Sequence, residues 1–126
     1  MVRTVWWMRI PAIRLAAAHA SAAAGTYVYE FHWASPGLGA VHALGIPFVF
    51  DTGTPDAPLF GPMLGEEPPQ ELAQTMHAAW VAFASTGAPG WPRHAPVRRA
   101  TMRFDAVSRV VEDPRAWERA LWTGML

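Results

Sequence analysis

The feature that most constrains the fold is an alternating segment that ends in a turn. Residues 27–33 read Tyr-Val-Tyr-Glu-Phe-His-Trp, with an aromatic side chain at every second position. A period of two is that of a pleated strand with one buried face. The Ser-Pro-Gly triplet at residues 35–37 predicts a turn directly after it. We therefore expect a strand over residues 27–33 that leads into a loop over residues 39–50.

That loop contains a candidate catalytic residue, His42, among small residues and glycines. Loops at strand ends are where α/β enzymes hold catalytic groups, because the sheet fixes the loop and the loop exposes the side chain. An imidazole titrates near neutral pH and therefore suits proton transfer. Residue type and spacing alone also allow a structural or simply exposed histidine.

Two further segments have helical patterns. Residues 9–20 predict a helix with Pro11 in its first turn, Ile10, Ile13 and Ala17 on one buried face, and Gly25 as its stop. Residues 69–86 predict a second helix, which ends at Gly87 and packs through Leu72, Met76, Ala79, Trp80 and Phe83. His77 falls off that stripe, so we expect it to be solvated.

The remaining segments are a long loop and a C-terminal hairpin with a helix. Residues 51–69 hold eight prolines and glycines, which predict a surface loop without regular structure. Residues 101–105 and 109–112 predict two short strands joined at 106–107. Pro114 then opens a last helix, for which we expect Trp117, Leu121 and Trp122 to be apolar anchors.

The N-terminus allows two interpretations. Met1, Arg3, an apolar stretch and small-residue triplets imitate a secretory signal. Arg9, Pro11 and Arg14 interrupt the apolar region, however, which favours a folded helix. We therefore expect a cytoplasmic protein, with secretion as the alternative.

Composition narrows the function classes. The chain has 126 residues, 52% of them hydrophobic and 16% charged, the size and composition of one globular domain. Its net charge is zero and its longest basic run is Arg98-Arg99, so neither nucleic acid nor a membrane is an expected partner. It has neither cysteine nor lysine, which excludes disulfides, a thiol nucleophile, a Schiff-base lysine and a P-loop. The five histidines lack metal-site spacing, so we predict no metal and no cofactor.

Five segments in order resemble type-B carboxylesterases, the para-nitrobenzyl esterase and cholinesterase relatives within the α/β-hydrolase fold. They are RIPAIRLAAAHA (9–20), TYVYEFHW (26–33), GAVHALGIPFVF (39–50), MHAAWVAFASTGAPGWPRH (76–94) and TMRFDAVSRVVEDPRAWERALW (101–122). The resemblance implies an α/β fold: the C-terminal portion of an α/β-hydrolase sheet with flanking helices and a terminal hairpin. Residues 1–126 are then expected to be a C-terminal fragment of a carboxylesterase-like domain.

The resemblance also implies a role for His42. In this family a histidine takes the proton of a nucleophilic serine and returns it to the leaving alcohol of a small-molecule ester. The family's serine stands in a G-x-S-x-G turn and precedes the histidine in the chain. That context is absent from all four serines of this chain, Ser21, Ser35, Ser85 and Ser108. We therefore expect the serine and the acid upstream of this chain. The chain alone would then be inactive.

Three positions depart from the family's pattern, and alternatives stay open. Gly45 stands where the family usually has an acid, three residues after His42, and Val5 and Ala17 stand where relatives often have Asp and Glu. These departures leave open a non-catalytic, partner-binding relative, a degenerate relic, or an unrelated α/β domain. An edge strand over residues 27–33 without its upstream neighbour would also favour self-association.

Overall fold

The computed structural model describes residues 2–125, which divide into two compact units. One unit contains residues 1–28, 92–101 and 110–126; the other contains residues 29–91 and 102–109. The expected α/β class is confirmed, with helices beside a small sheet that ends in a hairpin.

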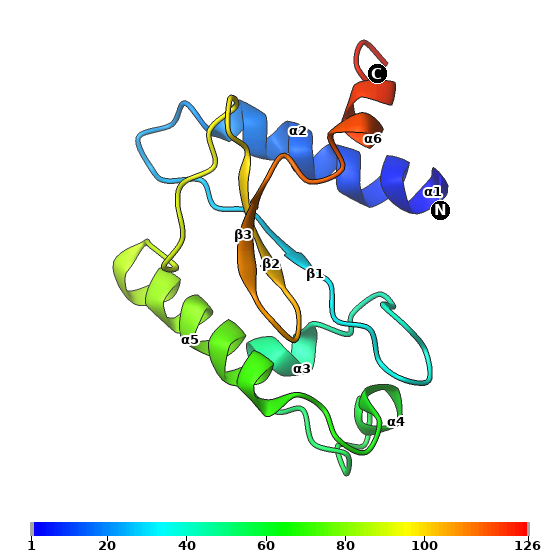
Figure 1. Ribbon diagram of the computed structural model, residues 1–126. Helices are drawn as coiled ribbons and strands as arrows, with labels where there is room; N and C mark the ends of the chain where they lie inside the picture. Colours follow the sequence, from blue (N-terminus) through cyan, green and yellow to red (C-terminus); the bar gives the residue numbers. More distant parts are fainter. Residues whose placement is uncertain (1, 126) are drawn as a thin grey trace. The chain divides into compact units, whose positions relative to one another are not determined.

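The first unit begins with one nearly continuous helical rod (Figure 1). It consists of α1 (Val2–Thr4), a π-helical turn η1 (Val5–Arg9) and α2 (Ile10–His19). Pro11 explains the wider turn, because it has no N–H to donate to the carbonyl of Trp7 and its ring crowds the preceding turn. The predicted helix over residues 9–20 is therefore confirmed and has a distorted extension before it.

Two details of that helix prediction are wrong. Gly25 is not its stop, because α2 ends at His19. A Cβ on Gly25 would lie 2.8 Å from the Tyr27 ring and 2.9 Å from the Arg93 guanidinium, so glycine there permits a close approach instead. The buried positions of α2 are Ile10 and Ala16, whereas Ile13 and Ala17 are only partly buried.

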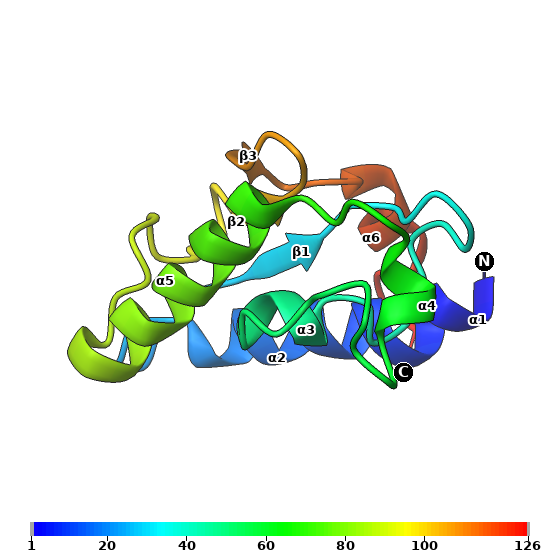
Figure 2. The same cartoon turned by 90° about the horizontal axis from the view of Figure 1, so that it is seen from below.

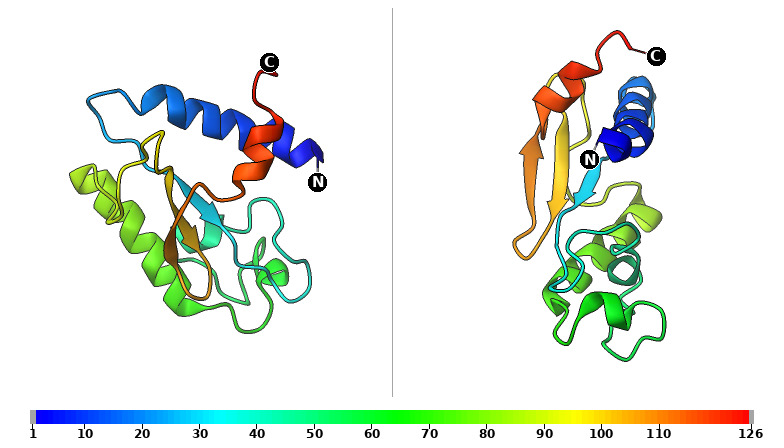
Figure 3. Two further views of the ribbon diagram at one scale, coloured as in Figure 1. Left: turned by 45° about the horizontal axis from the view of Figure 1, so that its top comes forward. Right: turned by 90° about the vertical axis from the view of Figure 1, so that its right-hand side faces the viewer.

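The sheet has three strands in the order β1-β2-β3: β1 (Tyr29–Phe31), β2 (Ala100–Phe104) and β3 (Arg109–Glu112). β1 runs parallel to β2, with Tyr29 opposite Met102 and Phe31 opposite Phe104. β2 and β3 form the expected hairpin (Figure 3). β1 is shorter at both ends than the predicted strand over residues 27–33; its last residue, Phe31, lies opposite Phe104, where β2 also ends. β1 lies at the edge of the sheet, as the prediction of self-association requires. Self-association itself stays a prediction.

In the second unit, α5 (Gln70–Thr86) is the longest helix (Figure 2). Gly87 ends it in the left-handed conformation at φ 74°, which glycine adopts without strain. Leu72 and Met76 are buried as predicted, whereas Trp80 and Phe83 are 42% and 45% exposed, so the prediction that they pack in the buried stripe is wrong for these two. The predicted helix over residues 69–86 is confirmed.

The prediction of no regular structure over residues 51–69 is wrong at α4 (Gly61–Leu64). Pro62 stands in the first turn of α4, where its missing N–H costs nothing. Gly61 lies against the carbonyl of Pro55 so closely that a Cβ would overlap it. Leu64 is fully buried in the core of this unit, which explains why a helical turn forms here.

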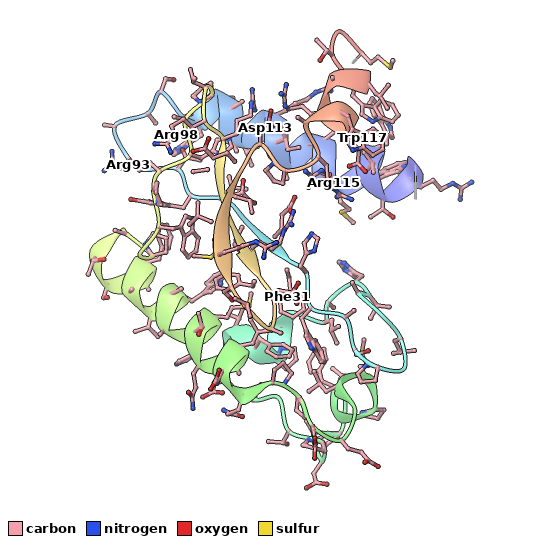
Figure 4. All side chains as sticks on the ribbon, viewed as in Figure 1. Phe31, Arg93, Arg98, Asp113, Arg115 and Trp117 are labelled. Atoms are coloured by element: carbon pink, nitrogen blue, oxygen red, sulfur yellow. The ribbon has the colours of Figure 1, made fainter. Side chains whose placement is uncertain are left out.

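The last helix, α6 (Ala116–Leu121), buries a different residue from those predicted. Trp117, labelled in Figure 4, is 60% exposed and Leu121 is 61% exposed, so neither is an anchor. Glu118 is the buried residue of α6, because the guanidinium groups of Arg9 and Arg115 each approach its Oε2 at 3.3 Å. Trp122 does pack, with its ring centroid 4.8 Å from that of Trp6.

Candidate active site

The loop that leads to His42 is closed by backbone hydrogen bonds. Ser35 and Gly39 bond each other in both directions, at 3.1 and 2.9 Å, and the Ser35 hydroxyl accepts the N–H of Leu38 at 3.2 Å. Gly39 has a φ of 72°, a conformation that favours glycine. The turn predicted at residues 35–37 is thus confirmed. Ser35 is buried in this structural role and is no candidate nucleophile.

His42 itself is exposed at the start of the turn over residues 42–45. Within the described residues, neither of its ring nitrogens has a hydrogen bond or ion pair. The next residue, Ala43, has a φ of 69°, and the one after it, Leu44, is fully buried. A non-glycine residue in this conformation is strained and persists only where its surroundings hold it. The buried Leu44 side chain supplies that hold, so the histidine is presented on an anchored turn.

A one-turn helix, α3 (Ile46–Val49), fixes the other end of the turn. Its Phe48 side chain is buried, with ring centroids 5.1 Å from Phe31 and 5.2 Å from Trp33. Both partners come from β1 or the residues just after it. These ring contacts attach α3 to the strand, and α3 directly follows the His42 turn.

The ring of Phe31 limits the space beside Gly45, the position where the acid is absent. A Cβ built on Gly45 would lie 3.3 to 3.4 Å from the ring of Phe31, which already packs on Phe48. A larger side chain would require that ring to move. At Gly45, where the family usually has an acid, the Phe31 ring therefore lies close to the place where a side chain would begin.

The other four histidines all have partners. His19 lies 2.7 Å from the hydroxyl of Thr26, and the Nδ1 of His94 lies 3.3 Å from the carbonyl of Ala100. His32 lies 3.5 Å from the carboxylate of Glu30, which also approaches Arg103 at 3.6 Å.

The fifth histidine, His77, contradicts its predicted solvation. It is only partly exposed, and its Nδ1 lies 2.8 Å from the carbonyl of Val49. His77 thus faces α3 at this point of α5, which a pattern within one helix does not reveal.

Perturbed acid–base groups lie elsewhere. Burial raises the pKa of the Tyr29 phenol on β1. Two further serines bond backbone carbonyls: Ser85, in α5, donates to Val81 at 2.8 Å, and Ser108, between β2 and β3, donates to Asp105 at 3.2 Å. No serine hydroxyl bonds a histidine in the described part of the chain, so its residues do not assemble a nucleophile with His42.

Neither a metal-ion site nor a membrane-spanning helix is present among residues 2–125. They contain no group of three or more His, Cys, Asp or Glu side chains arranged to hold a metal ion. No helix among them has the length and apolar character needed to cross a lipid bilayer.

A strand, a histidine loop, a covering helix and a terminal hairpin in this order define a segment of the α/β-hydrolase class. The model of the carboxylesterase family matches residues 2–119. The chain belongs to the carboxylesterase family.

Known relatives share this segment. The chain is 31% identical to the para-nitrobenzyl esterase of Bacillus subtilis, a match that covers 94% of this chain and 25% of that enzyme. The structure of the Geobacillus stearothermophilus carboxylesterase EST55 matches with a TM-score of 0.82 at 35% identity, over 97% of this chain and 27% of that one. An esterase from Clostridium hathewayi, described as able to hydrolyse aliphatic aromatic polyesters, matches with a TM-score of 0.76 at 26% identity, over 94% and 25%. The chain thus spans about a quarter of the length of these relatives.

Proposed function

We propose that this chain supplies the general-base histidine, His42, of a serine carboxylesterase that hydrolyses small carboxylic esters. The observation that carries the proposal is which histidine rings have hydrogen-bond or ion-pair partners. Of the five, only His42 has an imidazole without a hydrogen bond or ion pair among residues 2–125, and it stands on the anchored turn after β1. A general base needs a free ring nitrogen within reach of the proton that it takes.

In this mechanism the imidazole takes the proton of a serine hydroxyl as that oxygen attacks the ester carbonyl. It then returns the proton to the leaving alcohol, while a carboxylate at the other ring nitrogen holds the tautomer. The serine, the carboxylate and the oxyanion donors must come from the longer part of an esterase, which relatives have beyond the matched quarter. Loss of one oxyanion donor alone costs about a hundredfold or more in rate. We therefore propose that residues 1–126 alone do not hydrolyse esters.

A chimera tests the proposal. The matched quarter of the Bacillus subtilis para-nitrobenzyl esterase is replaced by this whole chain, and hydrolysis of a p-nitrophenyl ester is measured. We expect the chimera to be active and His42→Ala to lower kcat by about a thousandfold or more, because a triad base is lost.

The matched control is His19→Ala, which removes a histidine that bonds Thr26 and has no place in the proposed site. It should leave the rate unchanged. A folded chimera without activity, or one whose activity survives His42→Ala, would contradict the proposal. Hydrolysis by the chain alone would contradict its second part.

A further inference from the structure

The contact between His77 and Val49 shows which ring nitrogen of His77 carries the hydrogen. His77 lies on α5 and its Nδ1 is 2.8 Å from the carbonyl oxygen of Val49, the last residue of α3. A carbonyl only accepts, so Nδ1 carries the hydrogen of this bond. The last carbonyls of a helix have no intrahelical donor, and among the described residues it is His77 that satisfies this one.

A short path of hydrogen bonds leads from that contact to the His42 turn. The N–H of Val49 donates to the carbonyl of Gly45 at 3.1 Å, and the N–H of Ile46 donates to the carbonyl of Ala43 at 3.0 Å. Ala43 is the strained residue directly after His42. Any displacement of α3 along its axis is therefore transmitted to the backbone of the turn.

Apolar packing and the hydrogen bond from His77 both oppose such a displacement. Phe48 attaches α3 to the core, where it packs with Leu72 and Met76 of α5. Apolar contacts are less directional than hydrogen bonds, so the packing of Phe48 leaves the exact position of α3 along α5 less sharply defined than a hydrogen bond does. A hydrogen bond with one donor and one acceptor at a fixed distance does define it.

We propose that His77 is a positioning residue for His42. It acts through the Val49 carbonyl and α3 and does not contact the reacting atoms. The inference rests on the proposed function, because it assigns to His77 the task of placing the proposed base.

The first test uses the full chain and requires no activity. NMR of the His77 ring nitrogens should show the hydrogen on Nδ1 in the neutral ring. In His77→Leu, amide exchange at Phe48 and Val49 should become about five- to tenfold faster, because one hydrogen bond to α3 is lost. His77→Asn should restore slow exchange, since its side-chain amide carries an N–H at nearly the place of Nδ1.

The matched control is Gln70→Ala. It removes another bond from α5 to the segment after α3, from Gln70 Nε2 to Asp51 Oδ1 at 3.1 Å, but at the exposed surface. Exchange at Phe48 and Val49 should not change. A hydrogen on Nε2 alone, or equal exchange in His77→Leu and the unmodified chain, would overturn the inference.

The second test places the same variants in the esterase chimera. We expect His77→Leu to lower kcat by about tenfold with KM nearly unchanged, because misplacement of a catalytic group by about 1 Å costs up to about a hundredfold. His77→Asn should recover most of the rate, and Gln70→Ala should not alter it.

The two proposals fail in different ways. If His42→Ala abolishes the activity and His77→Leu does not change it, the positioning inference is overturned and the proposed function stands. If activity survives His42→Ala, the proposed function fails, while the exchange and NMR measurements still report on the bond from His77 to α3.

Discussion

The two units are stabilised by different kinds of contact. The unit with residues 29–91 and 102–109 has a continuous apolar core of Leu44, Phe48, Leu64, Leu72, Ala73, Met76 and Phe104. The unit with residues 1–28, 92–101 and 110–126 buries fewer and smaller apolar side chains, and it buries the carboxylate of Glu118 among them. Several of its large apolar side chains, including Trp7 and Leu15, are exposed instead.

Arginine–carboxylate pairs stabilise the unit with residues 1–28, 92–101 and 110–126. Arg9 on η1 pairs with Glu118 on α6 and donates to the carbonyl of Pro114. Asp113, shown in Figure 4, receives two hydrogen bonds from Arg119, at 3.0 and 2.6 Å. Such pairs depend on one particular partner, whereas an apolar core tolerates substitutions of similar volume. The candidate base thus stands on the more tolerant of the two regions.

The largest effect in this comparison should come from Phe48→Ala. It removes a buried ring directly behind the His42 turn, and we expect the free energy of unfolding to fall by about 4 kcal/mol, because a cavity replaces packed atoms. Urea denaturation followed by circular dichroism measures the change. The control Phe50→Ala removes a ring that is 65% exposed and should cost less than about 1 kcal/mol. Equal costs for the two variants would contradict the description of the core.

Sequence reasoning succeeded where the structure depends on local signals. The α5 helix has a wide apolar stripe and a glycine directly after it, and the hairpin has two short strands around a tight link. Both elements could be predicted because their start, period and end lie within one segment. The position of the His42 turn after a strand could be predicted for the same reason.

The errors concern residues whose environment is supplied from elsewhere in the chain. Glu118 is buried because Arg9, which lies far away in sequence, approaches it. His77 is bonded because α3 packs on a flank of α5 that reads as solvent-exposed. Leu64 made a helical turn favourable inside a proline-rich loop because the core accepts its side chain. No pattern within any of these segments contains the partner, so a single sequence does not reveal them.

The ion pairs of the other unit predict a smaller but still large effect for Glu118→Ala. The variant leaves Arg9, which is 13% exposed at its side chain, without its buried carboxylate, and we expect a loss of about 3 kcal/mol in urea denaturation. The matched control is Glu112→Ala, whose pair with Arg98 is exposed on both sides and should contribute less than about 1 kcal/mol. If Glu118→Ala is no more harmful than Glu112→Ala, the buried pairs do not stabilise this unit.

The smallest effect should be a pH dependence that arises from Asp113. The hydrogen bond from Arg119 lowers the pKa of this carboxyl group, with further contributions from the charges of Arg119, Arg99 and Arg9, while burial opposes them. A pKa that is lower in the folded state makes the pair stabilising above the unfolded value of about 3.9, and this stabilisation is lost as the pH falls through the folded pKa. We therefore expect Asp113→Asn to lower the free energy of unfolding by about 1 kcal/mol or less at pH 7 and to make no difference well below pH 4.

Thermal melts of the two proteins from pH 7 down to pH 2 measure that convergence. A constant gap between Asp113→Asn and the unmodified chain across the range would show that the pair contributes through its shape and not through its charge. In that case the contrast between a charged and an apolar unit would be weaker than the contacts indicate.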